Sequence, residues 1–193
     1  MATTSTGQTS ASVRYVIDTR ASQFTVQAFA GGLISAVAHS PKIAIRDWTG
    51  VVQMSSTLDS LSLKVQVKSS SLEVLDELPD SDRREIHRVM NREVLESTQF
   101  PEVIYDSTQV AVEKLKDDLY RLNVRGRLNL HGVSNDQDII AQVSLAVDSA
   151  RAYGSFTLLQ SDYNIRIASI AGGTLKLQDE LKFYFYVVAR KQE

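Results

Sequence analysis

The chain contains no cysteine among its 193 residues, and only three prolines. The absence of cysteine excludes a disulfide framework, thiol catalysis and a thiolate metal site. A large excess of either charge is also missing, because 21 basic residues nearly balance 23 acidic ones. Proteins that bind nucleic acid usually carry a basic excess, so that function is not expected. No stretch approaches the roughly 18 consecutive apolar residues that a membrane-spanning helix needs.

The first twelve residues, MATTSTGQTSAS, have neither the charged nor the apolar segment of a secretory signal. We expect residues 1–12 to form a disordered tail and residues 13–193 to form a single domain. The expected location is the cytoplasm, or the periplasm if a signal has been removed from the precursor.

Apolar and polar residues alternate along much of the chain, a pattern typical of strands with two different faces. The alternation is clearest over residues 119–131 and recurs over residues 61–68 and 139–147. A dozen alternating residues suit the long, tilted strands of a barrel wall. Because little proline or helix is available to protect sheet edges, closure is the simplest way to pair them. The pattern therefore predicts an all-β fold, a closed antiparallel barrel of about eight strands.

Two segments break this alternation. Residues 80–96 place Ile86, Val89 and Met90 on one side at helical spacing, which predicts one helical insertion. A shorter stretch, LISAVAH at residues 33–39, is expected to make at most one helical turn.

Five segments resemble, in their order and spacing, the motifs of one known family: YVIDTRASQFTVQ (15–27), RREIHRVMNREVLESTQFPEVIYDST (83–108), YRLNVRGRLNLHGVS (120–134), LLQSDYNI (158–165) and LQDELKFYFYVVAR (177–190). The family is that of the YceI-like proteins, lipocalin-like barrels whose members bind polyisoprenoids or other long-chain lipids. Glu85, Arg88 and Asn164 depart from the family's usual Asp, Leu and Gly. The resemblance implies a lipocalin-like barrel that is hollow rather than filled.

On this basis we expect a binding or carrier protein, without a catalytic residue or a bound metal, that holds a polyisoprenoid, a quinone or a fatty-acyl derivative. Burial of the chain would drive binding, and polar groups at the mouth would hold the head. The residues expected to contact the ligand, from the inner wall and the mouth, are Phe24, Val26, Phe29, Leu33, His39, Trp48, Val65, Val67, His87, Tyr105, Leu122, Val124, Phe156, Leu158, Phe183 and Phe185.

An enzyme is the first alternative. The only histidines are His39, His87 and His131, and three imidazoles can hold a catalytic zinc with one position left for water. Their spacing does not favour this interpretation, because no two of them stand at the i, i+4 separation of a helical metal site.

A homodimer is the second alternative, and it is compatible with the carrier. The last strand, residues 181–188, is apolar on both faces. Its outer face is therefore expected to contact another element or a second copy of the chain.

Overall fold

The computed structural model describes residues 12–31, 40–55, 60–167, 169–170 and 175–192. Residues 1–11, almost all of the expected tail, lie outside this part, and so does the LISAVAH segment that was expected to make a helical turn. Within the described ranges, no helix is long and apolar enough to cross a membrane.

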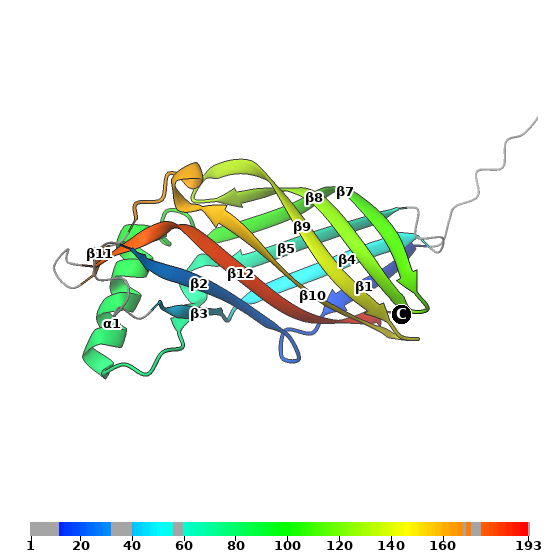
Figure 1. The fold of residues 1–193 in the computed structure, drawn as a ribbon, viewed down its shortest axis with the longest axis horizontal. Coiled ribbons are helices and arrows are strands. Elements are labelled where there is room, and N and C mark those ends of the chain that lie inside the picture. Colours follow the sequence, from blue (N-terminus) through cyan, green and yellow to red (C-terminus); the bar gives the residue numbers. More distant parts are fainter. Residues whose placement is uncertain (1–11, 32–39, 56–59, 168, 171–174, 193) are drawn as a thin grey trace, which may run out of the picture.

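Twelve strands of the described chain form one antiparallel sheet that curls into a barrel (Figure 1). They are β1 (Ser12–Ile17), β2 (Gln23–Gly31), β3 (Lys42–Ile45), β4 (Trp48–Ser55), β5 (Leu61–Lys68), β6 (Leu72–Val74), β7 (Glu102–Lys116), β8 (Leu119–Leu130), β9 (Val133–Leu145), β10 (Ser149–Leu159), β11 (Ser169–Ile170) and β12 (Leu175–Gln192). The barrel closes because β1 pairs with β4 on one edge and with β12 on the other.

Six of these strands combine into three long, bent ones. β1 and β2 both pair with β12 and form the first bent strand. β3 and β4, which pair with β2 and β1, form the second. β5 and β6, which pair with β4 and β3, form the third. With β7, β8, β9, β10 and β12, these bent strands complete the predicted eight-stranded barrel. At the first bend, the Val188 N–H donates to Ser22 Oγ at 2.9 Å, and that hydroxyl donates to the Asp18 carbonyl at 2.7 Å. Hydrogen bonds therefore hold the bend against β12.

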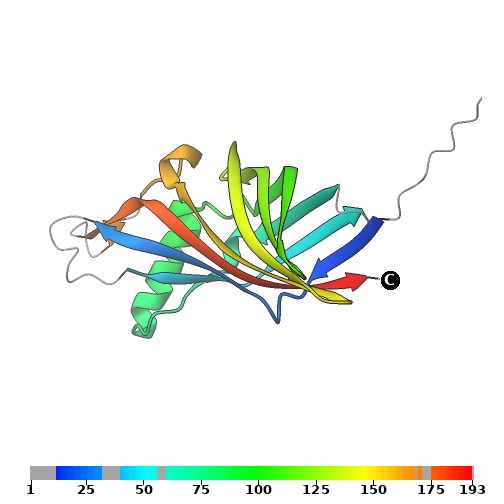
Figure 2. The ribbon, with the colours of Figure 1, turned by 45° about the vertical axis from the view of Figure 1, so that its right-hand side comes forward.

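Helix α1 (Asp80–Val89) and the π-helical turn that continues it (Met90–Val94) confirm the predicted helical insertion. They lie across one end of the barrel, opposite the end at which β1 and the end of β12 meet (Figures 1 and 2). Arg83 fixes the helix to β6, because its Nη1 donates to the Val74 carbonyl at 3.0 Å. Two short 3-10 turns, η1 (Ser69–Ser71) and η3 (Gln160–Tyr163), complete the fold.

Paired charges cover the outer face of β5, β7, β8 and β9. Lys64, Asp106, Arg127 and Asp136 stand opposite one another in register across these four strands. The Lys64–Asp106 and Arg127–Asp136 ion pairs measure 3.3 Å and 3.8 Å.

The outer face of β9, β10 and β12 carries exposed apolar and aromatic side chains among its polar ones. Ile140, Tyr153, Tyr184 and Tyr186 are 57%, 52%, 43% and 41% exposed there, and Tyr153 stands directly opposite Tyr186. We call these four residues the aromatic patch. Within the described residues no element covers it, so in this part of the chain the outer face of the last strand contacts no further element.

Candidate ligand-binding cavity

The interior of the barrel is hollow. It encloses a cavity of about 1330 Å³, above the roughly 300–1,000 Å³ of common small-molecule sites. Residues from eleven of the strands and from α1 line it, mostly with apolar side chains. Because strand residues alternate between faces, every second residue of each wall strand points into this space.

The structure brings together twelve of the sixteen residues that the sequence assigned to the ligand. All twelve line the cavity: Phe24, Val26, Trp48, Val65, Val67, Tyr105, Leu122, Val124, Phe156, Leu158, Phe183 and Phe185. That they touch a ligand stays a prediction.

The other four residues do not line the cavity in the described chain. Phe29 is half-buried on the opposite face of β2 from Val26, because the inward residues of this strand have even numbers. His87 is exposed on α1, where its ring lies beside the Asn91 amide at 3.2 Å. Leu33 and His39 lie outside the described residues.

A row of aromatic rings crosses the wall of the cavity from β4 through β2 and β12 to β10. Trp48 meets Phe24 edge to face at 5.6 Å between ring centroids. Phe24 lies 6.2 Å from Phe183, which stacks on Phe156 at 4.7 Å and 5°. We call these four residues the aromatic row. They present flat, polarisable surface to whatever occupies the cavity.

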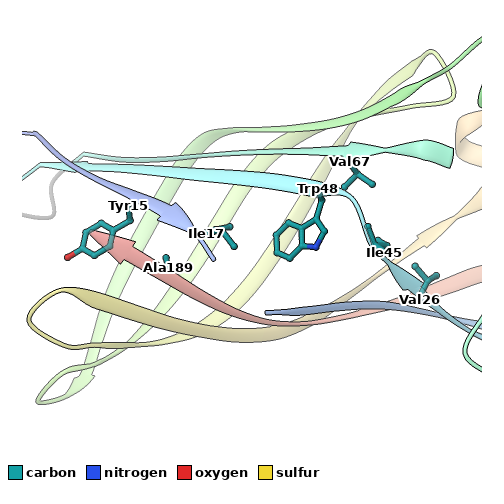
Figure 3. Packing of buried hydrophobic residues seen from close by; sticks show 7 residues of the cluster. All are labelled: Tyr15, Ile17, Val26, Ile45, Trp48, Val67 and Ala189. Carbon is teal, nitrogen blue, oxygen red and sulfur yellow. The ribbon is translucent and has the colours of Figure 1, made fainter. Parts of the chain in front are cut away.

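Buried side chains pack together at the end of the cavity near β1. Figure 3 shows Tyr15, Ile17 and Trp48 projecting between the walls, and all three belong to one buried cluster with Ala189. A side chain at Gly50 would place its Cβ 2.2 Å from Ile17 Cδ1, so the glycine makes room for Ile17. This end therefore serves as the floor of the cavity.

The end near α1 is the mouth. Ile86, Val89 and Met90 line the cavity from the helix, which explains their helical spacing in the sequence. Among the described lining residues, only Glu77 and Glu85 are exposed, and both lie at this end. The cavity therefore reaches solvent beside α1. Sequence reasoning missed these five residues as lining, although the apolar side of the predicted helix was a signal for the first three.

Tyr105 is a buried residue of the cavity wall with a polar group. Its hydroxyl donates to the Gln137 carbonyl at 3.1 Å. Burial raises the pKa of the Tyr105 phenol to about 12, and the charge of Asp138 adds to this effect. The ring fits because Gly126 faces it, where a Cβ would lie 2.4 Å from Tyr105 Cζ. The phenol is therefore neutral under physiological conditions.

His131 joins three segments outside the cavity. Its Nε2 lies 2.8 Å from Glu96 Oε2, its Nδ1 lies 3.2 Å from the Tyr163 carbonyl, and its ring lies 4.3 Å from that of Phe100. The described chain holds no group of three or more His, Cys, Asp or Glu side chains placed to bind a metal. The structure does not bring His87 and His131 together around one site, and nothing in it favours the enzyme alternative.

A closed antiparallel barrel with an apolar interior and a helix across its mouth defines the lipocalin-like class of ligand-binding barrels. The chain belongs to the YceI-like domain family, whose model matches residues 15–189. The family resemblance found in the sequence is thereby confirmed.

Solved structures agree with this assignment at the level of the fold. The chain is similar to BcnA of Burkholderia cenocepacia, with 15% identity over 89% of this chain and 98% of the other, at a TM-score of 0.68. It is also similar to a polyisoprenoid binding domain from Saccharophagus degradans implicated in plant cell wall breakdown (13%, 92% and 98%, TM-score 0.67). The YceI protein of Campylobacter jejuni matches with 14% identity over 78% and 85%, at a TM-score of 0.59. No curated protein matches the sequence.

Proposed function

We propose that this protein binds or carries a long-chain apolar ligand, a polyisoprenoid, a quinone or a fatty-acyl derivative, inside the barrel. The observation that carries the proposal is the apolar cavity of about 1330 Å³ that extends from the helix at its mouth to the packed floor. A stable fold does not retain so large an apolar space for packing alone, because protein interiors are close-packed.

The energetics of burial favour such a ligand. Each buried CH₂ contributes about 0.8 kcal/mol, so ten of them contribute about 8 kcal/mol before the costs of association. The aromatic row offers additional contact to the double bonds of a prenyl chain or to a quinone ring. The similarity to a polyisoprenoid binding domain supports the same ligand class.

Native mass spectrometry of the purified protein, followed by solvent extraction, tests this proposal. We expect a lipid-sized mass that denaturation releases, or saturable binding of a fluorescent long-chain lipid to the extracted protein. If the protein carries no lipid and binds none, the proposal is wrong.

A pair of tryptophan variants locates the binding site. Val65 points into the middle of the cavity and belongs to both packed clusters of the wall, whereas its neighbour Gln66 bonds to Glu102 on the outside. We expect Val65→Trp to weaken binding because its indole projects into the path of the ligand, and Gln66→Trp to leave it unchanged. Equal binding by both variants would place the lipid outside the barrel.

We further propose that the aromatic patch is the contact between two copies of the chain. The four residues of the patch are uncharged, while the neighbouring outer face carries charge pairs, and Lys182 Nζ lies 5.2 Å from the centroid of the Tyr184 ring. A two-fold contact would place the same patch of both copies face to face. We expect light scattering to give the mass of a dimer, and Tyr186→Arg to give that of a monomer. A monomer at every concentration of the unmodified protein contradicts this.

A further inference from the structure

The charged residues that line the cavity all carry the same sign. They are Asp76, Glu77 and Glu85, and they lie at the mouth, in the link between β6 and α1 and on the helix itself. Among the described residues that line the cavity, none is a lysine, an arginine or a histidine. The head group of a bound lipid would meet these carboxylates where the cavity reaches solvent.

The guanidinium groups of α1 nearest these carboxylates are engaged by the protein. Arg83 donates to the carbonyls of Val74 and Asp76 at 3.0 Å and 3.2 Å. Arg88 forms ion pairs of 2.7 Å with Glu85 and 2.9 Å with Glu93, and the hydrogen bond from Arg88 lowers the pKa of Glu85. These two arginines are therefore engaged by protein groups, and the ion pair with Arg88 also offsets part of the charge of Glu85.

The other groups described at this end do not present a cation to the cavity. Lys42 is exposed and does not line it, and its backbone N–H donates to Asp76 Oδ2 at 2.9 Å. The N-terminus of α1, which would otherwise attract an anion, carries Asp80 and Asp82 in its first turn. Arg84 and Arg92 are exposed on the helical insertion and do not line the cavity.

Proteins that bind phosphate or carboxylate head groups present arginine, lysine or free backbone N–H groups to them. A diphosphate at this mouth would face carboxylates instead. Two like charges 4 Å apart cost about 1 kcal/mol even in water, and about 1.4 kcal/mol is a tenfold change in affinity. A hydroxyl, by contrast, can donate a hydrogen bond to a carboxylate.

Given the proposed lipid-binding function, on which this inference rests, we propose that the acidic mouth selects long-chain lipids with an uncharged head group. An alcohol, a quinone or an amide is accepted, and the diphosphate or the carboxylate of the same chain is discriminated against.

Matched lipids that differ only in the head group test this selectivity. Geranylgeraniol and geranylgeranyl diphosphate are titrated against extracted protein loaded with a fluorescent naphthylamine probe, and hexadecanol and palmitate form a second pair. We expect the alcohol of each pair to displace the probe at a concentration at least about tenfold lower, with the difference shrinking as salt is added.

Charge reversal at the mouth is the companion experiment. Glu77 is exposed, so Glu77→Lys should fold normally, and we expect it to reduce the preference for the alcohol about tenfold. Glu77→Gln should reduce it by less. The control is Asp117→Lys, because Asp117 lies in the turn between β7 and β8, with a side chain 98% exposed, and does not line the cavity. This control should keep the preference of the unmodified protein.

Each outcome separates the two proposals. If the diphosphate displaces the probe as well as the alcohol does, or if Glu77→Lys changes nothing, the head-group selectivity is wrong and the lipid-binding function stands. If neither the probe nor any lipid binds, the lipid-binding function itself fails.

Discussion

The protonation of the buried Tyr105 phenol makes the stability of the fold depend on pH in the alkaline range. Burial raises the pKa of its phenol to about 12, whereas an unfolded tyrosine ionises near pH 10. Between these values the unfolded chain has lost the proton that the folded chain keeps. The stabilising contribution is therefore fully present below about pH 10 and is lost as the pH rises toward 12.

We expect the free energy of unfolding, measured with urea across this alkaline range, to fall less steeply for Tyr105→Phe than for the unmodified protein. Tyr153→Phe is the control, because Tyr153 is exposed on the aromatic patch. If Tyr105→Phe keeps the slope of the unmodified protein, the phenol is not the titrating group.

Gly126 makes the position of the Tyr105 ring possible. In Gly126→Ala the new Cβ would lie 2.4 Å from Tyr105 Cζ and 2.7 Å from the Asp106 carbonyl oxygen. Overpacking of this kind costs roughly 1–3 kcal/mol. We expect urea unfolding to show that loss, and the double variant with Tyr105→Leu to be more stable than the sum of the two single effects. Strictly additive losses would show that the ring is not what the alanine meets.

At the level of elements, the β8–β9 hairpin secures the helical end of the barrel. His131 and Gly132 form its turn with φ of 53° and 75°, the signature of a two-residue type I′ turn. A histidine in the left-handed region carries backbone strain, and the contacts of its ring with Glu96 and Tyr163 compensate for it. The hairpin, the end of the helical insertion and η3 are therefore joined at one side chain.

We expect His131→Asn to loosen the helical end. Asparagine tolerates the left-handed backbone but cannot reach all the partners of the imidazole ring. Hydrogen exchange should become faster over residues 91–100 and in η3, with little change elsewhere. The control is Asp118→Asn in the β7–β8 turn, where φ is 58°. Unchanged exchange in the helical insertion would show that His131 does not hold it.

At the scale of the whole molecule, the hollow interior makes stability depend on the ligand. A ligand that binds only the folded state adds about 2.7 kcal/mol at a concentration one hundred times its Kd. We expect solvent extraction to lower the melting temperature and added geranylgeraniol to restore it. The lipid should raise the melting temperature of Val65→Trp by less, because its indole occupies part of the space that the ligand needs. A lipid-independent melting temperature in the unmodified protein contradicts this.

Alternation with period two determined the wall of this barrel from sequence alone. The predicted inward-facing residues do point inward, among them Val65, Tyr105, Val124 and Phe183. Side chains of a strand alternate between its two faces, so the face of one residue determines the face of the others. The helical insertion was equally predictable, since Ile86 and its apolar partners recur at the spacing of a helix.

The spacing in the sequence already sets Phe29 and His87 apart from the inward-facing residues, whereas only the tertiary structure decided the course of the bent strands. Phe29 is as hydrophobic as Phe24, but it lies an odd number of residues away and so faces outward. His87 directly follows Ile86, and because successive residues of a helix point in different directions, His87 points away from the cavity when Ile86 points into it. Bends and bulges depend on pairing with strands far away in the sequence, as at residues 18–22 against β12.

Whether the barrel is hollow was also a tertiary property. The alternation predicts which side chains face inward, but strand number, tilt and stagger together set the radius of a closed barrel. The same inward residues would fill a narrower barrel completely. Eight long strands at this radius leave about 1330 Å³ open. The three carboxylates at the mouth are far in sequence from most of the wall residues, and only the folded chain brings them to the same cavity.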